Sequence, residues 1–276
     1  MSTDSNAESV LTIGRCLDAG GDVLRVRPGG SEQPLLAGAG LHSGDKIMTA
    51  NDATASLKFS DGTLIELSAD SVLVIDGFAY ESDVGDDGAY FTLTMGVCVI
   101  EAGDLAIGAD DFIIASGDST FSLRGARIAV RADPLAYDLV TLLPSRRGPL
   151  GEVLVQNKIG VQLLNRAFQT VRLGGAETDI PAPLTLPSGV LRDTYAGPGM
   201  ADALFPVDAT EDAEDLSEQF QPFRALQDRL LERQFIARQV FPSDGPAKSG
   251  EGDTFLEDAF EGTRFRLAEP DPEATG

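Results

Sequence analysis

The sequence of 276 residues contains no tryptophan, one histidine and two cysteines. Four cysteine or histidine ligands for a structural zinc ion are therefore lacking. A Ser-His-Asp triad could use only His42 with Ser43 and Asp45, and side chains so close in sequence rarely point at one another. No Gly-x-Ser-x-Gly elbow is present. We therefore expect His42 to be a solvated turn residue and the protein not to be an enzyme. A hydrolase with two carboxylates stays open, because sequence cannot place two carboxylates across a cleft.

Basic side chains are scarce, with 21 lysines and arginines against 44 aspartates and glutamates, and the formal net charge is −23. Binding to nucleic acid depends on cations that neutralise phosphates, so no nucleic-acid partner is expected. The glycine-rich motifs that hold nucleotide phosphates are also absent. The acidity suits a cation or a basic protein. We expect the partner to be another protein or a second copy of the chain, with a glycan as a further candidate.

Long apolar runs are missing, so no transmembrane helix is expected. Residues 1–9 lack the basic and apolar segments of a secretory signal. One disulfide between Cys16 and Cys98 is possible. However, Cys98 stands in the apolar run 96–100, which favours a buried thiol, because free cysteine packs like a small hydrophobic residue.

Short apolar runs separated by glycine and aspartate fill the sequence from residue 10 to about 175. Ala55, Leu57 and Phe59 alternate with polar residues, which is typical of a half-buried strand, and Asp61-Gly62 then predicts a turn. We therefore expect a β-hairpin over residues 53–68. Many short strands at this spacing predict an all-β fold, a multi-stranded β-sandwich or a short β-solenoid. The other strands are expected at 10–13, 23–26, 45–49, 72–75, 90–94, 97–100, 112–115, 121–123, 128–130, 139–143, 153–155, 161–164 and 170–173.

The C-terminal third differs in composition. Five prolines mark 174–206 as a packed or extended connector. An amphipathic helix is expected over 222–241, because its apolar residues recur at helical spacing. Its apolar face either docks on the β domain, which we favour, or binds a partner or a second copy. The candidate docking residues are Phe223, Leu226, Leu230, Leu231 and Phe235. The expected organisation is a lead-in over 1–19, a β domain over 20–190, a Pro-rich then acidic linker over 191–221, the helix over 222–241, and an acidic tail, disordered or docked, over 242–276.

One loop could hold a metal ion. Asp83, Asp86 and Asp87 cluster in a loop that contains glycine, and Ca²⁺ takes carboxylate oxygens from such loops. The spacing is not that of an EF-hand, and a solvated hairpin loop is the favoured interpretation. We expect no other cofactor.

Three short motifs follow one another along the sequence. Gly44-Asp45-x-Ile47-x-Thr49 is followed by Asp61-Gly62-Thr63 and later by Leu123-Arg124-Gly125. In order and spacing this pattern resembles the FecR domain of bacterial envelope proteins over about 20–190. Aspartate and threonine cap turns, and glycine supplies unusual backbone angles. We therefore assign these residues to the turns of the fold and not to chemistry: Gly44, Asp45, Asp61, Gly62, Thr63, Arg124 and Gly125.

The resemblance implies an all-β domain without catalytic activity. Founding members of the family are membrane-tethered regulators that relay a signal from an outer-membrane transporter to a sigma factor. That relay needs an anti-sigma segment and a membrane span, and we expect neither here. Our first hypothesis is a structural or binding module of the bacterial cell surface or an extracellular assembly, exported by a route that reads a C-terminal segment. The alternative is a soluble regulatory or sensory binding protein inside the cell.

Overall fold

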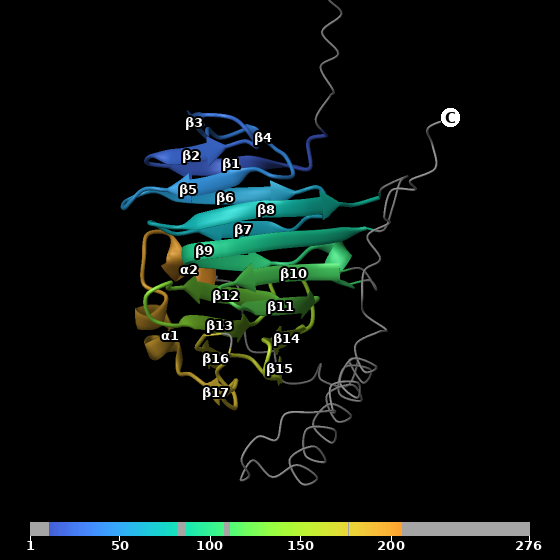
Figure 1. Cartoon of the computed structure of the whole chain (residues 1–276), viewed down its shortest axis with the longest axis vertical. Coiled ribbons are helices and arrows are strands. Elements are labelled where there is room, and N and C mark those ends of the chain that lie inside the picture. The colour runs from blue at the N-terminus through green and yellow to red at the C-terminus, as the bar shows by residue number, and fades with distance from the viewer. Residues whose placement is uncertain (1–10, 82–86, 108–110, 176, 206–276) are drawn as a thin grey trace, which may run out of the picture. The chain divides into compact units, whose positions relative to one another are not determined.

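The computed structural model describes residues 11–81, 87–107, 111–175 and 177–205 (Figure 1). Of the two compact units of the chain, Met1–Leu230 and Leu231–Gly276, all described residues belong to the first. The helix expected at 222–241 and the acidic tail expected at 242–276 lie outside them. None of the helices in these ranges is long and apolar enough to span a membrane.

Strands dominate the described residues and pair into two sheets, which confirms the predicted all-β class. Sheet A is wholly antiparallel; in sheet B only the pairing of β9 with β10 is parallel. The strand order of sheet A is β4 (Gly40–Leu41), β1 (Gly14–Gly20), β6 (Thr54–Phe59), β7 (Leu64–Leu67), the second half of β9 (Gly88–Glu101), β12 (Arg127–Ala132), β13 (Asp138–Leu143), β16 (Gln169–Leu173) and β17 (Leu184–Thr185). The order of sheet B is β3 (Glu32–Pro34), β2 (Val23–Val26), β5 (Lys46–Thr49), β8 (Val72–Ala79), the first half of β9, β10 (Asp111–Ser116), β11 (Ser119–Arg124), β14 (Glu152–Gln156) and β15 (Val161–Leu164).

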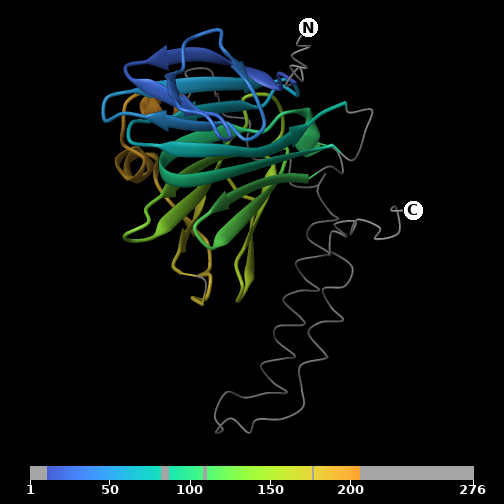
Figure 2. The ribbon, with the colours of Figure 1, turned by 45° about the horizontal axis from the view of Figure 1, so that its top comes forward.

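The two sheets face each other and form a sandwich, with the chain passing repeatedly from one layer to the other (Figure 2). Phe59 of sheet A stacks on Phe78 of sheet B, with ring centroids 5.1 Å apart, and meets Phe91 of β9 edge-on at the same distance. Burying each such ring stabilises the fold by about 1.5–3 kcal/mol. The predicted hairpin is confirmed, because β6 and β7 pair with Ala55 opposite Leu67.

One strand belongs to both sheets. The sequence predicts separate strands at 90–94 and 97–100, but β9 is continuous and changes sheet at Gly96. Met95 pairs with Val72 in sheet B, and Gly96 pairs with Ala132 in sheet A. Gly96 has φ +95°, and a Cβ there would overlap the backbone of Ser71. The corner between the layers therefore requires glycine.

Both cysteines are free and buried. No disulfide joins Cys16 of β1 to Cys98 of β9, and the buried thiol predicted for Cys98 is confirmed. Burial raises the pKa of the Cys98 thiol to about 12 and also raises the pKa of Cys16. Both side chains therefore stay protonated and pack as apolar groups.

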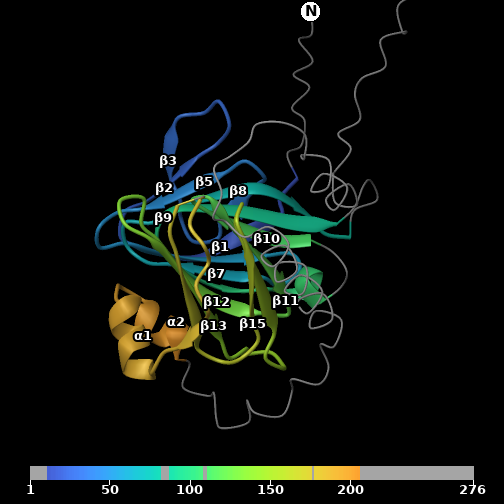
Figure 3. The ribbon, with the colours of Figure 1, turned by 60° about the horizontal axis from the view of Figure 1, so that its bottom comes forward.

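Two short helices, α1 (Ser188–Thr194) and α2 (Met200–Leu204), lie in the stretch that the sequence predicts to be a connector. They cover the outer face of sheet A (Figure 3) and bury Leu191 and Met200 there. Tyr195, fully buried, shares a 2.7 Å hydrogen bond with the Thr141 hydroxyl on β13. The sheet residues beneath the helices are Val99, Ala129, Leu139 and Leu143.

Candidate functional site

The turn Asp61-Gly62-Thr63 connects β6 to β7, and its Asp61 and Thr63 side chains are buried. Thr63 donates from its backbone N–H to Asp61 Oδ1 and from its hydroxyl to Oδ2, both at 2.8 Å. The Gly103 N–H then donates to Thr63 Oγ1 at 2.9 Å. Burial raises the pKa of Asp61, and the bonds from Thr63 counteract part of that rise. Gly62 has φ +88°, which favours glycine.

A second predicted turn meets the first through the short helix η1 (Asp104–Ile107). The Asp104 N–H donates to the Asp61 carbonyl at 3.0 Å, and the Gly125 N–H donates to the Ala106 carbonyl at 2.8 Å. Gly125 also has positive φ, at +53°. The structure thus brings the motif at 61–63 and the motif at 124–125 to the same end of the sandwich, where they brace η1.

The Asp45 carboxylate is fully buried among three basic side chains. Its Oδ2 lies 4.0 Å from Arg25 Nη1 and 3.6 Å from His42 Nδ1, and its Oδ1 lies 3.9 Å from Arg27 Nε. The same carboxylate accepts the His42 N–H at 3.0 Å and so closes the turn that precedes β5. Gly44 beside it has φ +85°.

The nearby serine does not complete a triad. Ser43 Oγ accepts the Phe78 N–H of β8 at 3.2 Å, and no hydrogen bond joins it to His42 in the described part of the chain. The imidazole instead packs with its Nδ1 3.6 Å from Asp45 Oδ2, and at 13% side-chain exposure it is not the solvated turn residue that the sequence predicts. The side chains at 42–45 are therefore engaged in holding β5 against β8.

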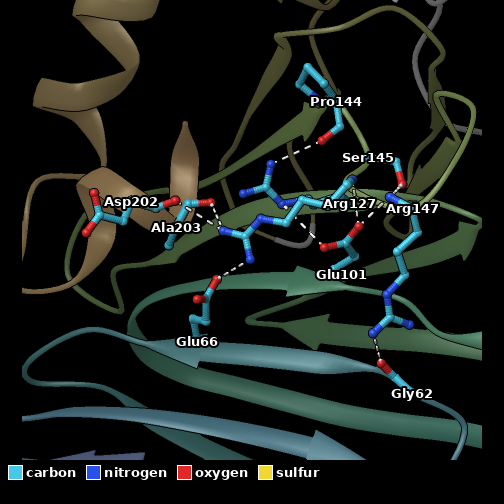
Figure 4. A network of polar contacts seen from close by, with 10 residues as sticks. Gly62, Glu66, Glu101, Arg127, Pro144, Ser145, Arg147, Asp202 and Ala203 are labelled. Atoms are coloured by element: carbon cyan, nitrogen blue, oxygen red, sulfur yellow. Dashed lines mark hydrogen bonds and ion pairs between the residues drawn. The ribbon is translucent and has the colours of Figure 1, made fainter. Parts of the chain in front are cut away.

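Two buried side chains on the outer face of sheet A carry opposite charges (Figure 4). Arg127 is 1% exposed and Glu101 is 4% exposed, and Arg127 Nε lies 4.0 Å from Glu101 Oε2. Arg127 Nη1 donates to the Pro144 carbonyl at 3.1 Å. Burial and the neighbouring Arg146 lower the pKa of Arg127 to about 10, whereas Glu101 and Glu66 act in the opposite direction.

Arg146 links this pair to helix α2. Its Nη1 lies 3.4 Å from Glu66 Oε2, and its Nη2 donates to the carbonyls of Asp202 and Ala203 at 3.1 and 3.2 Å. Its backbone N–H donates to Glu101 Oε1 at 2.7 Å. These contacts join β7, β9 and the 144–147 loop to α2.

Of the three calcium candidates, Asp83 and Asp86 lie outside the described residues. Asp87 accepts the Glu81 N–H at 2.8 Å through Oδ2. Within the described ranges, no three histidine, cysteine, aspartate or glutamate side chains gather so as to hold a metal ion. The calcium site stays a prediction. The docking candidates of the expected helix, Phe223, Leu226, Leu230, Leu231 and Phe235, also lie outside the described residues.

The outer face of sheet B presents aliphatic side chains. Leu24, Met48 and Val72 stand side by side on β2, β5 and β8. The next row consists of Val26, Lys46 and Val74, with the lysine between the two valines. The five aliphatic residues are half-buried, while their neighbours along each strand point into the core. We call these five residues the open face. Helices α1 and α2 lie on the other side of the sandwich, against sheet A (Figure 3).

Sheet A gives an internal comparison for the open face. Where α1 and α2 cover it, its outward residues are apolar, as at Val99 and Ala129. Where the helices do not reach, β1 and β6 present Arg15, Ser56 and Lys58, and Arg15 stands opposite Lys58. The aliphatic outer face of β2, β5 and β8 resembles the part of sheet A that α1 and α2 cover, and this marks the open face as a candidate docking surface. Sequence reasoning missed it, because Leu24 and Met48 were never assigned to a common face.

Comparison of the sequence with models of protein families finds one match. Residues 45–142 match the family model described as FecR protein. No curated protein matches the chain. Two crystal structures of a protein from Parabacteroides distasonis ATCC 8503, provisionally named an anti-sigma factor, are similar to it. Their sequence identities are 17% and 16%, over 49% of this chain and 57% of the other, each with a TM-score of 0.39. The chain therefore spans little more than half of the length of those proteins.

The matched segment is narrower than the 20–190 expected from the motifs. It begins at the buried Asp45 turn, contains the braced turns at 61–63 and 124–125, and ends within β13. These are the turns that organise the two sheets, so the family match and the fold agree. Residues 45–142 of this chain are therefore similar to a FecR domain.

Proposed function

We propose that this chain is a regulatory or sensory protein that acts by binding another protein through its FecR domain, without catalysis. The family match over 45–142 carries this proposal. It is the alternative that the sequence analysis left open beside a structural role at the cell surface. No comparable observation supports the cell-surface role or an export route.

The engagement of the polar side chains supports a binding role. Asp45 is enclosed by Arg25, Arg27 and His42, and Arg127 is enclosed by Glu101 and the 144–147 loop. Groups tied into such contacts hold strands together. The side chains that remain available for recognition are those of the outer faces, the open face among them.

Tagging the protein in its source organism and quantifying what co-purifies after mild crosslinking tests the proposal. We expect one protein in near-stoichiometric amount, and a change in the expression of a small set of genes when the gene for this chain is deleted. An unrelated acidic β protein with the same tag is the control for nonspecific capture. Unchanged gene expression together with no partner above that control would refute the regulatory role.

A further inference from the structure

The open face has an acidic border along one side. Asp22 stands two residues before Leu24, and Asp70 stands two residues before Val72. The Ala50 N–H donates to the Asp22 carbonyl at 3.0 Å, and the Asp70 N–H donates to the Ala50 carbonyl at 3.1 Å. These bonds continue the three strands β2, β5 and β8 by one row. The border of the aliphatic face therefore consists of the turns that carry Asp22 and Asp70, with Asp52 two residues after Ala50.

These three aspartates carry uncompensated charge. Asp22, Asp52 and Asp70 are all exposed, and in the described part of the chain none of them lies within 4 Å of a lysine, arginine or histidine nitrogen. Asp45, by contrast, is buried and lies beside Arg25 and Arg27. We call Asp22, Asp52 and Asp70 the acidic edge.

We propose that the open face and the acidic edge together dock an amphipathic helix of a partner protein, one with an apolar stripe flanked on one side by lysine or arginine. The inference rests on the proposed function and names its surface and the chemistry of its partner. The apolar stripe would cover Leu24, Met48 and Val72, as helices α1 and α2 cover sheet A, and the cations would lie against the acidic edge.

The dimensions suit a short helix. Adjacent strands lie about 4.8 Å apart, so the row from Leu24 through Met48 to Val72 spans about 10 Å between its ends. Met95, 39% exposed and paired with Val72, extends the row by one more strand. The total of about 14 Å equals between two and three helical turns of 5.4 Å.

Charge argues against a second copy as the occupant. Each chain carries a formal net charge of −23, and a symmetric contact would bring two acidic edges toward the same interface. Like charges placed together oppose association, whereas a cationic partner is drawn toward this surface. The surface thus fits a basic amphipathic segment of another protein.

The test uses the full-length chain and a fluorescein-labelled 18-residue peptide of leucine and lysine, with the leucines spaced to fall on one face of a helix. Two control peptides are needed: one of identical composition with the leucines scrambled around the helix, and one with glutamate in place of lysine. By fluorescence anisotropy we expect the designed peptide to bind at least about tenfold more tightly than either control. Equal binding of the scrambled peptide would mean attraction to the net charge alone and would overturn the proposal.

Variants locate the binding. Met48→Gln with Val72→Thr removes apolar contact at nearly constant size, and changing the three aspartates of the acidic edge to asparagine removes the charge. Each set should weaken peptide binding by about tenfold. The matched control is Ile113→Thr, an outward, half-buried position on β10 of the same sheet, and it should leave binding unchanged. Thermal unfolding of every variant verifies the fold, and hydrogen exchange of the wild type should show protection in β2, β5 and β8.

Other results would overturn the proposal. Protection from hydrogen exchange outside β2, β5 and β8 would show that the peptide does not bind at the open face. An effect of Ile113→Thr on peptide binding equal to that of Met48→Gln with Val72→Thr would show the same. If light scattering shows that the wild type is a dimer and that Met48→Gln is a monomer, the open face binds a second copy of the chain. Peptide binding seen only after deletion of 222–241 would assign it to this chain. If the natural partner still co-purifies with the variants that lose the peptide, the site fails while the proposed function stands.

Discussion

The buried pair of Glu101 and Arg127 should respond asymmetrically to neutralisation of its two members. The pKa of Arg127 falls from 12.5 to about 10, which corresponds to roughly 3 kcal/mol against the charged form in the folded state. Burial thus opposes this charge even though Glu101 attracts it. At 4.0 Å and an effective dielectric constant of about 20, that attraction is about 4 kcal/mol.

Glu101→Gln removes the attraction and leaves Arg127 buried, so it should lower the free energy of unfolding by about 3–5 kcal/mol. The glutamine can still accept the Arg146 N–H, which isolates the loss of charge. Arg127→Met also removes the attraction and leaves Glu101 buried, but that carboxylate keeps the bonds donated by the Ser145 hydroxyl and the Arg146 N–H. The cost of Arg127→Met should be smaller, about 1–2 kcal/mol, part of it from the lost bond to Pro144.

Urea unfolding followed by circular dichroism gives both values, with the m-value as the check that the unfolding transition is unchanged. The double variant should cost less than the sum of the two single variants by about 2 kcal/mol or more, because the second change removes a group that the first has stranded. A coupling below about 0.5 kcal/mol, or an Arg127→Met cost equal to that of Glu101→Gln, would refute the reasoning.

Three further predictions concern other contacts. Gly96→Ala should lower the free energy of unfolding by at least about 3 kcal/mol or prevent folding, because the φ of Gly96 is +95° and the added Cβ has no room. Gly125→Ala, with φ +53° and open space around the added Cβ, should cost about 1–2 kcal/mol. Thermal unfolding of both variants measures the difference. Tyr195→Phe removes the bond to Thr141 and should lower stability by about 1 kcal/mol, with faster hydrogen exchange over 188–204; unchanged exchange would contradict the anchoring role. Burial raises the pKa of Asp61, so the folded state holds that proton more tightly than the unfolded chain does. The stability of the wild type relative to Asp61→Asn should therefore rise as the pH falls from neutral toward 3.8, and a difference independent of pH in urea titrations would contradict this.

The strand content of this protein could be predicted from sequence because its physical cause is local. Ala55, Leu57 and Phe59 alternate with polar residues, since one side of β6 meets the core and the other meets water, and Asp61-Gly62 marks the turn. The buried thiol at Cys98 could also be predicted, because it stands in an apolar run. Period-two alternation and turn chemistry act within a few residues, so a single sequence reports them.

Features that depend on distant contacts could not be predicted in this way. The corner of β9 requires glycine at 96 because Ser71 lies against it, and nothing near Gly96 in sequence reveals that contact. Helices α1 and α2 have seven and five residues, too few for an apolar periodicity, and they are held by sheet A through Tyr195. The open face likewise arises only when β2, β5 and β8 pair, because its members are far apart along the chain.

The FecR motifs and the candidate docking surface occupy different parts of the same strands. Asp45, Asp61 and Thr63 are at most 2% exposed, so they cannot touch a partner, and their bonds instead fix how β5, β6 and β7 are connected. The outward residues of β2, β5 and β8 are free of that constraint, since a substitution such as Met48→Gln changes the surface without touching the turns. A match to the family therefore identifies the scaffold, and we expect the choice of partner to depend on outward positions such as Met48. It follows that exchanging the open face and the acidic edge between two FecR domains should exchange their partners while leaving both folds intact.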